Sequence, residues 1–511
     1  MSAKAVGQDR WNHIDKLAEG GFNKVFLLKS GDTQEEVIAR IPTPIAGPPH
    51  YTTASEVATL NFLRNVLGLP VPKVLAYSAT SMNPVGAEYI IMERIHGESL
   101  ASRWLSLTTK DVKDIMMQIA EIEQKLFLFQ LPGYGSLYHK HDIEGEPRLD
   151  IPVEGDFCIG PVAKRQFWHG ERLHMKVDRG PCECSLLLCS CIINNSFNTP
   201  VTGTSAEDCL TSAARREIAC LAEHAKPQPR KTFLLPTDHN IDPSEQADLL
   251  TKFLQLSPLL VPPEQTFRTP TLRHPDLSLS NILLTPGSTK IASIIDWQDT
   301  VAFPHFMQAG YPAFCEHDWS QTQSLKIPTL PEEFDKLTPE EKTQAKTKLR
   351  LDEANLYYTA ATGVYNEEHM KALKIPHLGM RQYLTQQTVY PWDADVINLR
   401  AALVGVTTPN IWNSISSQPC PVSFSEEERE KAMNESSEWN ESEALLSRIR
   451  ENLGIDLEGG TGIDNFEWAS QRNLEFRLEF LRQAEDHQRE ICWRNWPYKD
   501  DTDFSSPPNI D

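Results

Sequence analysis

The sequence predicts an α+β protein with two lobes, a small N-terminal lobe built on an antiparallel sheet and a large helical C-terminal lobe. Short apolar runs bounded by glycine or proline fill the chain as far as Glu93, which is typical of strands. Beyond that residue, apolar side chains recur mainly at helical spacing. We therefore expect a sheet lobe at residues 1–93, a helical lobe at 94–424 and an acidic helical extension at 425–511.

The first lobe is expected to start with strands joined by tight turns. Residues 14–41 follow the order strand, glycine turn, strand, turn, strand, which predicts an antiparallel hairpin arrangement. After a proline-rich segment, Thr53 and Glu56 form a capping-box pattern ahead of a helix whose apolar face includes Leu60. Two later runs, VPKVLAY and AEYIIMERI, predict strands because they are short and rich in branched or aromatic residues.

The helical lobe is expected to begin with a long helix that Thr108 and Asp111 cap. Clustered prolines at residues 227–243 and 258–270 predict long loops packed on a helical body. The final segment, residues 426–511, holds 22 acidic and 10 basic residues. Because it still has apolar residues at helical spacing, we expect amphipathic helices with an acidic, solvated face.

The charge and the apolar runs limit the classes of partner. The chain has 49 Lys and Arg against 70 Asp and Glu, a net charge of −21, which argues against nucleic acid as the main partner. The longest apolar run, at residues 184–193, falls well short of the roughly 20 residues that span a bilayer. The N-terminus has no apolar signal segment, and its Asp9 and Asp15 are unusual in a mitochondrial presequence. Ten cysteines without a disulfide-like spacing favour a reducing compartment.

The clearest chemical signal is the segment LRHPDLSLSNILL. It contains Asp276 and, five residues later, Asn281, and Asp296 follows at the end of the strand-like run IASIIDW. Phosphoryl transfer uses such a set, with one carboxylate to accept the proton of an attacking hydroxyl group and an amide and a second carboxylate to hold Mg²⁺. We expect His274 to brace the backbone of this loop, and Asp299 to be a turn residue, with a further metal ligand as the alternative.

The N-terminal half supplies candidate nucleotide-binding residues. Gly20 and Gly21 would let backbone N–H groups approach phosphates, although a glycine pair is also a good turn. Arg40, on the third strand, would bind phosphates, and Glu56 would either cap its helix or pair with Arg40. The run that ends at Glu93 would hydrogen-bond an adenine through its backbone, with a plain buried strand as the alternative.

Taken together, the segments GGFNKVF, YIIME, HPDLSLSN and IIDWQ resemble the aminoglycoside phosphotransferase-like branch of the protein-kinase-like fold. In more detail, IARIPTPIAGPPHYTTASEVATL, NPVGAEYIIME and PGYGSLY are similar to a fungal family that includes altered inheritance of mitochondria protein 9. The resemblance runs from about Leu17 to Phe314. It implies a five-stranded small lobe, a large helical lobe, ATP with Mg²⁺ between them, and a mitochondrial location, with a cytoplasmic one as the alternative.

The chain departs from the resemblance at two places. Its first strand starts by about residue 14, from which we expect a shortened start. Where the family tends to read DRGPW, this chain reads DRGPC and continues with a nearly uncharged segment, residues 182–203. We expect this segment to be a translated intron, and sequencing of the transcript tests this. Its cysteines, at positions 182, 184, 189 and 191, could instead bind zinc, although their spacing is tighter than in usual zinc knuckles.

Three functions follow, in order of preference. The first is an ATP- and Mg²⁺-dependent phosphotransferase acting on a small hydroxyl-bearing molecule, with Asp276 as base, Asn281 and Asp296 on the metal, and Arg40, oriented by Glu56, on the phosphates. The second is a nucleotide-binding pseudokinase or adaptor in mitochondria, which the arginine in place of the usual third-strand lysine favours. The third is a metal-binding interaction protein built around the cysteine cluster.

Overall fold

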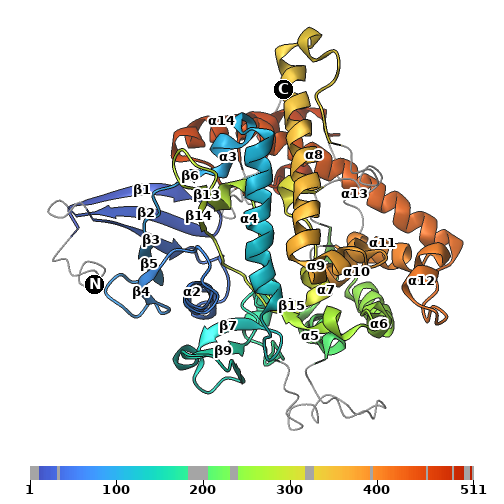
Figure 1. Ribbon diagram of the computed structural model, residues 1–511. Coiled ribbons are helices and arrows are strands. Elements are labelled where there is room, and N and C mark those ends of the chain that lie inside the picture. Colours follow the sequence, from blue (N-terminus) through green and yellow to red (C-terminus); the bar gives the residue numbers. More distant parts are fainter. Residues whose placement is uncertain are drawn as a thin grey trace.

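The computed structural model has two lobes of different composition (Figure 1). It describes residues 11–30, 35–181, 205–230, 240–316, 327–391, 395–455, 459–485, 488–499 and 507–508. The cysteines of the expected insertion, with the rest of residues 182–203, lie outside the described residues. A small antiparallel sheet forms the N-terminal lobe and helices dominate the remainder, so the predicted α+β, two-lobed, kinase-like fold is confirmed.

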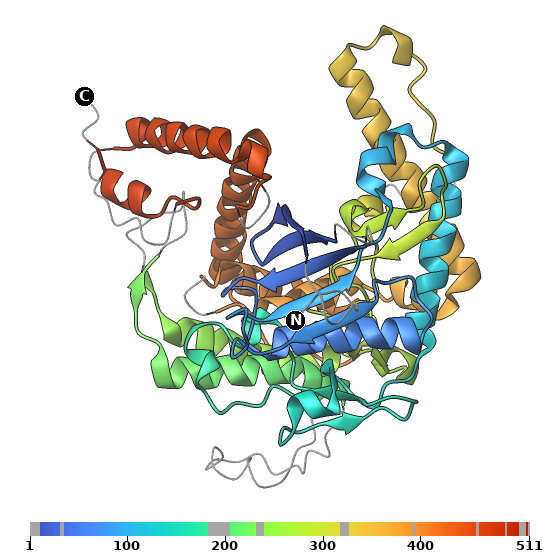
Figure 2. The ribbon, with the colours of Figure 1, turned by 90° about the vertical axis from the view of Figure 1, so that its left-hand side faces the viewer.

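The small lobe is a five-stranded antiparallel sheet of order β1-β2-β3-β5-β4. Its strands are β1 (His13–Glu19), β2 (Asn23–Lys29), β3 (Glu36–Pro42), β4 (Val74–Ser78) and β5 (Tyr89–Glu93). The central strand β3 pairs with β2 and β5, and Arg40 stands between Val25 and Ile90. Helix α2 (Tyr51–Asn65) runs beneath the sheet (Figure 2).

Helix α2 begins earlier than the sequence pattern predicted. It starts at Tyr51. The preceding residue, His50, has a φ of 73°, and its side chain makes no capping hydrogen bond. Thr53 lies inside the helix and donates its hydroxyl to Glu88, 2.6 Å away. Glu56 faces the lobe interior, with 4% of its side chain exposed. The predicted capping box is therefore wrong. Glu56 instead pairs with Arg40, which was the alternative role predicted for it.

The large lobe is built around two long helices that lie side by side, α4 (Thr109–Leu128) and α8 (Pro339–Tyr365) (Figure 1). The predicted cap of α4 is present, because Thr108 and Asp111 form a capping box. The further helices are α3 (Leu100–Arg103), α5 (Ala206–His224), α6 (Pro243–Leu260), α7 (His305–Gln308), α9 (Glu367–Leu373), α10 (Leu378–Gln387), α11 (Ile397–Val406) and α12 (Pro409–Ile415).

Short strands connect these helices. A three-stranded sheet has the order β14-β13-β6, another has the order β7-β9-β8, and two pairs join β10 to β11 and β12 to β15. Their bounds are β6 (Glu98–Ser99), β7 (Ser136–His139), β8 (Leu149–Asp150), β9 (Phe157–Gly160), β10 (Gln228–Pro229), β11 (Asn240–Ile241), β12 (Pro270–Thr271), β13 (Ile282–Leu284), β14 (Ile291–Ile294) and β15 (Phe303–Pro304). The hairpin β13–β14 follows the predicted catalytic loop directly.

Pro258 was expected in a loop but lies in the last turn of α6. A proline there removes one helical hydrogen bond, to the carbonyl of Leu254. Ser257 donates its hydroxyl to that carbonyl at 3.3 Å, so the helix continues to Leu260.

The C-terminal extension consists of α13 (Glu426–Leu453), α14 (Ile463–Gln483) and α15 (Arg489–Arg494). Ser425 and Glu428 form a capping box at the start of α13. Leu446, Ile449 and Leu453 pack with Trp496 in a small apolar cluster of the extension. Amphipathic helices were predicted here, and the buried face and exposed carboxylates agree with that prediction.

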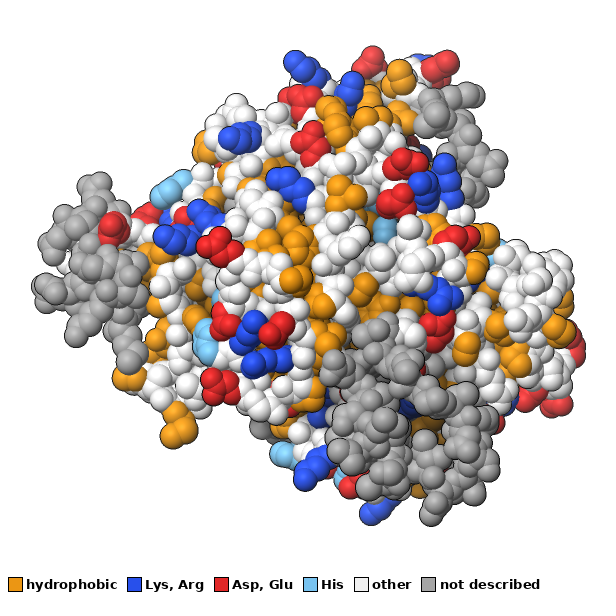
Figure 3. All heavy atoms as spheres, turned by 60° about the horizontal axis from the view of Figure 1, so that its bottom comes forward, with side chains coloured by type: hydrophobic (Ala, Val, Ile, Leu, Met, Phe, Trp, Pro, Cys, Tyr) orange, Lys and Arg blue, Asp and Glu red, His pale blue; other side chains and the backbone are white. Residues whose placement is uncertain are grey.

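One hydrophobic core runs from the small lobe into the large one. It contains Phe62 of α2, Ile115 of α4, Ile282 of β13, Trp297 and Tyr358 of α8, each almost wholly buried. On the face shown in Figure 3, basic and acidic side chains are interspersed over the described atoms that are visible. Within the described ranges, no helix has the length and apolar character needed to cross a membrane.

A buried polar network anchors the loop before Asp276. Arg273 donates to Glu123 of α4 at 3.0 Å and to the carbonyls of Gln308 and Gly310 at 3.2 and 2.8 Å. Tyr358 also donates to Glu123. Burial opposes the charged form, but Glu123 raises the pKa of Arg273 above its ordinary value.

Removing Arg273 should therefore destabilise the protein strongly. Arg273→Met leaves the Glu123 carboxylate buried without its counter-charge, which costs about 3–5 kcal/mol. Arg494→Met removes an exposed ion pair to Glu490, whose side chains are 73% and 69% exposed, and should change the free energy of unfolding by less than about 1 kcal/mol. Urea denaturation of the two variants checks this, and equal losses would contradict it.

Candidate functional site

The candidate site is centred on the loop between β12 and β13. His274 is buried and donates from Nε2 to the carbonyl of Ile295 at 2.9 Å, while the backbone N–H of Asp276 donates to its Nδ1 at 3.1 Å. A neutral imidazole with its proton on Nε2 satisfies both bonds. Burial lowers the pKa of His274, which favours that neutral form. His274 thus braces the backbone, as the sequence predicted.

Asn281 lies against Asp276. Its side-chain N–H donates to the carbonyl of Asp276 at 2.9 Å, and its own carbonyl accepts from the N–H of Ile295 at 2.9 Å. The amide oxygen of Asn281 remains as an acceptor. Asp276 itself is exposed to solvent. These bonds hold the backbone of both residues beside the segment that leads into Asp296.

Asp296 follows β14 with a left-handed backbone, φ 65°. Its Oδ1 accepts from Arg40 at 2.6 Å, and 48% of its side chain is exposed. The structure therefore brings Asp296 to the third strand of the small lobe, 256 residues earlier in the chain.

Arg40 is the centre of this contact. One terminal nitrogen donates to Glu56, and the other donates to Asp296 and to Gln298, at 2.6 and 2.8 Å. Burial opposes its charge, but Glu56 and Asp296 together raise the pKa of Arg40. Burial also raises the pKa of Glu56 to about 7, against the opposing effect of Arg40.

Gln298 is a site residue that the sequence analysis missed. Its amide oxygen accepts from Asn23 at 2.7 Å and from Arg40, and its N–H donates to the carbonyl of Ala46 at 3.0 Å. It thus joins the glycine turn, β3 and the proline-rich segment. Its only signal in the sequence was its place two residues after Asp296, which does not reveal a bridging amide.

The glycine turn lies next to these residues. Gly20 donates its N–H to the carbonyl of Asn23 at 3.1 Å, and Thr43 donates its hydroxyl to the carbonyl of Gly21 at 3.0 Å. A Cβ atom added to Gly20 would meet nothing within 4 Å, so open space faces this residue.

Glu93 is placed apart from the cluster around Arg40. Its carboxylate accepts from Arg64 at 2.7 Å and from the N–H of Lys73 at 2.8 Å, and its own N–H donates to the carbonyl of Lys73 at 2.9 Å. Any contact of Glu93 with an adenine would therefore use its backbone carbonyl.

Asp299 occupies a turn, as expected, with φ 62°. Its Oδ1 is buried and accepts no hydrogen bond from the described residues. Burial raises the pKa of Asp299 to about 6, and Lys164 opposes the rise. Lys164 and its neighbour Arg165 were also missed from the sequence, because they lie in an unremarkable segment after β9.

The donor set suits a hard cation. The amide oxygen of Asn281 and the half-exposed carboxylate of Asp296 are oxygen ligands of the kind that Mg²⁺ takes together with nucleotide phosphates. Among the described residues, no group of three or more His, Cys, Asp and Glu side chains could hold a metal by itself. A cation here would take its further oxygens from a bound phosphate or from water.

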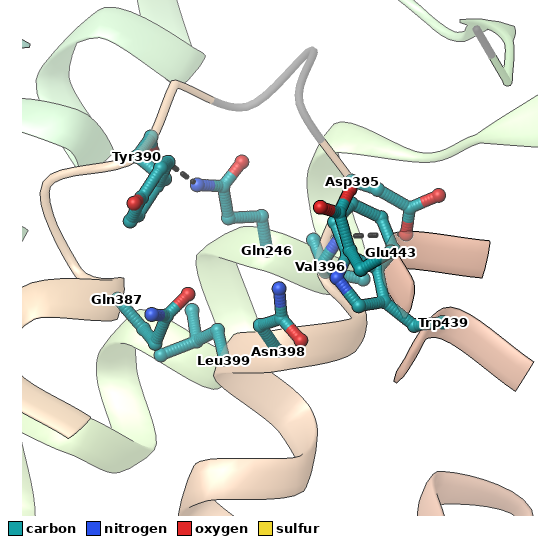
Figure 4. A pocket seen from close by; sticks show the side chains of 9 residues that line it. All are labelled: Gln246, Gln387, Tyr390, Asp395, Val396, Asn398, Leu399, Trp439 and Glu443. Atoms are coloured by element: carbon teal, nitrogen blue, oxygen red, sulfur yellow. Dashed lines mark hydrogen bonds between the residues drawn. The ribbon is translucent and has the colours of Figure 1, made fainter. Parts of the chain in front are cut away.

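A separate cavity of about 330 Å³ lies among α6, α11 and α13 (Figure 4). The amides of Gln246, Gln387 and Asn398 line it together with Trp439 and Glu443. In Figure 4, Gln246 donates to the carbonyl of Tyr390, at 3.4 Å. None of the residues predicted from the sequence lines this cavity.

Comparison with known proteins gives the relationship. A protein of Aspergillus fumigatus named subtelomeric hrmA-associated cluster protein is 65% identical over 509 residues, which cover 98% of this chain and 99% of that protein. The chain belongs to the family of this protein. A second A. fumigatus strain has a protein of the same name with the same identity and coverage. No protein-family model matches the chain.

More distant relatives of this subtelomeric cluster protein family are named altered inheritance of mitochondria protein 9, mitochondrial. The one from Candida tropicalis is 26% identical over 452 residues, covering 81% of this chain and 68% of that protein. One from Saccharomyces cerevisiae is 27% identical over 359 residues, covering 65% and 54%.

Two solved structures are similar to this member of the family at low sequence identity. An ADP-bound aminoglycoside phosphotransferase, APH(2'')-Ib, has a TM-score of 0.39 and 14% identity, covering 79% of this chain and 97% of that one. An ethanolamine kinase of Plasmodium vivax has a TM-score of 0.34 and 13% identity, covering 80% and 86%.

The buried carboxyl group of Asp299 should make stability depend on pH. Since its pKa in the folded protein is raised to about 6, its stabilising contribution is present below the pKa of the unfolded chain and is lost as the pH rises through 6. Asn has the same shape and tolerates the left-handed backbone. Asp299→Asn should therefore stabilise the protein by roughly 2 kcal/mol more at about pH 8 than at about pH 4.

Urea denaturation at the two pH values measures this difference. The matched control is Asp150→Asn, because the side chain of Asp150 is 58% exposed and the variant should show a much smaller change with pH. An Asp299→Asn effect that is the same at both pH values would show that Asp299 titrates normally.

Proposed function

We propose that this protein is a phosphotransferase that moves the terminal phosphoryl group of ATP, with Mg²⁺, to a hydroxyl group of a small molecule. The main support is the meeting of two distant segments at one point. Arg40 of β3 is bonded both to Glu56 of α2 and to Asp296, which follows the catalytic loop. This arrangement places a third-strand cation and its helix carboxylate beside the carboxylate proposed to hold the metal, and phosphoryl transfer uses parts of these kinds.

Asp276 is the proposed base. Its carboxylate is exposed, and its backbone is fixed by His274 and Asn281. It would accept the proton of the acceptor hydroxyl while the hydroxyl oxygen forms a bond to the γ-phosphorus. The bond from that phosphorus to the β–γ bridging oxygen breaks, and ADP leaves with the electron pair.

Asn281 and Asp296 are the proposed ligands of Mg²⁺. The side-chain N–H of Asn281 is used to fix the backbone of Asp276, so its amide oxygen is available, and Asp296 keeps one oxygen that Arg40 does not take. When bound, the metal supplies positive charge that neutralises the phosphates. Arg40 and Glu56 would hold Asp296 in position for this.

The nucleotide would lie under the glycine turn. Gly20 and Gly21 would line the phosphates, and the carbonyl of Glu93 would meet the adenine. The excess of acidic residues over the whole chain, a net −21, suits a cationic acceptor.

We also propose a role in mitochondria, which the names of the relatives from Candida tropicalis and Saccharomyces cerevisiae support. The second candidate function is a nucleotide-binding pseudokinase or adaptor. The observation that favours it is that Arg40 donates to three protein acceptors, which leaves this residue less free to bind phosphates.

ATP with Mg²⁺ should stabilise the folded protein. At a nucleotide concentration of 100 times the dissociation constant, the free energy of unfolding should rise by about 2.7 kcal/mol. Thermal-shift and urea measurements with ATP, with and without Mg²⁺, check this. Omission of the metal should remove most of the gain, and absence of any gain with the metal would contradict both candidate functions.

Asp276→Asn should abolish transfer while leaving nucleotide binding intact. Loss of the base should lower the rate of ADP release with an accepted substrate by roughly 10²- to 10⁴-fold. A coupled ADP assay against sugars, amino alcohols and aminoglycosides measures it, with the exposed Asp150→Asn variant as control. Transfer that survives Asp276→Asn would remove the base assignment, and ATP binding without any transfer by the unchanged protein would favour the adaptor.

A further inference from the structure

Three protein acceptors already bind the guanidinium group of Arg40. Glu56 takes one terminal nitrogen, Asp296 and Gln298 take the other, and Nε is buried without an acceptor in the described part of the chain. Arg40 is 8% exposed. Two carboxylates already balance its charge, and a phosphate that bonded to the nitrogen shared by Asp296 and Gln298 would have to displace one of these acceptors.

The ammonium group of Lys164 is a further cation, and no described carboxylate holds it by an ion pair as Glu56 and Asp296 hold Arg40. No hydrogen bond or ion pair joins it to a described residue, and its Nζ lies 5.2 Å from the centre of the Phe303 ring. The carboxylate of Asp299 interacts with it through charge, and burial lowers the pKa of Lys164. A partly desolvated ammonium group with free N–H donors gains more from an incoming anion than a solvated one does.

The segment that carries Lys164 reaches the glycine turn through the neighbouring Arg165. Its neighbour Arg165 lies over the ring of Phe22, 5.6 Å from the centre, and Phe22 follows Gly20 and Gly21 directly. The N–H of Val162 donates to the carbonyl of Arg179 at 2.8 Å.

Two further bonds hold the same segment. The N–H of Ala163 donates to Ser136 at 3.0 Å. The carbonyl of Lys164 accepts from Phe167 at 2.9 Å, at the start of a short 3₁₀ helix. This segment therefore contacts the glycine turn through Arg165 and interacts with Phe303 and Asp299 through Lys164.

We propose that Lys164 is the phosphate-binding cation of this site and that Arg40 is a positioning residue, which holds Asp296 and Glu56 instead of binding the nucleotide. This inference rests on the proposed function. It assigns the phosphate-binding charge to the segment after β9 instead of to the third strand. A compact ammonium group on a flexible side chain can adjust to phosphate chains of different length, whereas a guanidinium group held by two carboxylates cannot. Asp299 serves as the resting counter-charge of Lys164 when no phosphate is present.

The test is equilibrium binding of ATP with Mg²⁺, ADP with Mg²⁺, and adenosine to the full chain and its variants. Lys164→Met should weaken ATP binding roughly 10- to 100-fold, the equivalent of one charge-assisted hydrogen bond. Adenosine, which has no phosphate, should bind as tightly as it does to the unchanged protein. Lys164→Arg keeps the charge and should restore part of the ATP affinity.

Two controls separate the alternatives. Lys113→Met removes an exposed lysine of α4 and should leave both affinities unchanged. Arg40→Lys keeps a cation beside Glu56 and Asp296 and should change ATP affinity less than Lys164→Met does. If Lys164→Met binds ATP normally and Arg40→Lys binds it more weakly, the inference is overturned while the proposed function stays intact. Failure of the unchanged chain to bind ATP would overturn both.

Discussion

The buried guanidinium of Arg40 joins the two lobes, and the place where the small lobe meets the candidate site depends on it. Its partners come from three elements: Glu56 from the helix beneath the sheet, Asp296 from the end of a hairpin in the large lobe, and Gln298 from the following turn. Removal of any one carboxylate would leave a buried charge less compensated, which is costly in a dry interior. The relative position of the lobes at this point is therefore specified by electrostatics as well as by the shared apolar core of α2, α4 and β13.

The loop that carries Asp276 is held by a second, separate set of bonds. Arg273 is fixed by Glu123 of the long helix α4, and the next residue, His274, spans from Asp276 to Ile295. The loop conformation is thus determined by the large lobe alone. The small lobe contacts the segment after this loop, at Asp296 and Gln298. A small rotation between the lobes would therefore alter these contacts while leaving Asp276 and Asn281 in place.

Local patterns in the sequence predicted the elements that depend on local physics. The alternation around Arg40 gave its strand, Thr108 and Asp111 gave the start of α4, and the order of Asp276, Asn281 and Asp296 gave the catalytic loop. Thr53 misled because its hydroxyl has a distant partner, Glu88, which competes with the helix end. Gln298 and Lys164 could not be found in this way, because their contacts come from segments that the fold brings together. Asp299 was recognised as a turn residue, but its burial beside Lys164 was not.

The amide of Gln298 makes the site sensitive to deamidation. It accepts from Asn23 and Arg40 through one atom and donates to the carbonyl of Ala46 through the other. Spontaneous deamidation would replace it with an isosteric acid that, once ionised, has no proton to donate. The carbonyl of Ala46 would then face a second acceptor, and a further anion would join Glu56, Asp296 and Asp299. A chemical change too small to disturb packing would therefore break the hydrogen bond that ties Ala46 of the proline-rich segment to Gln298.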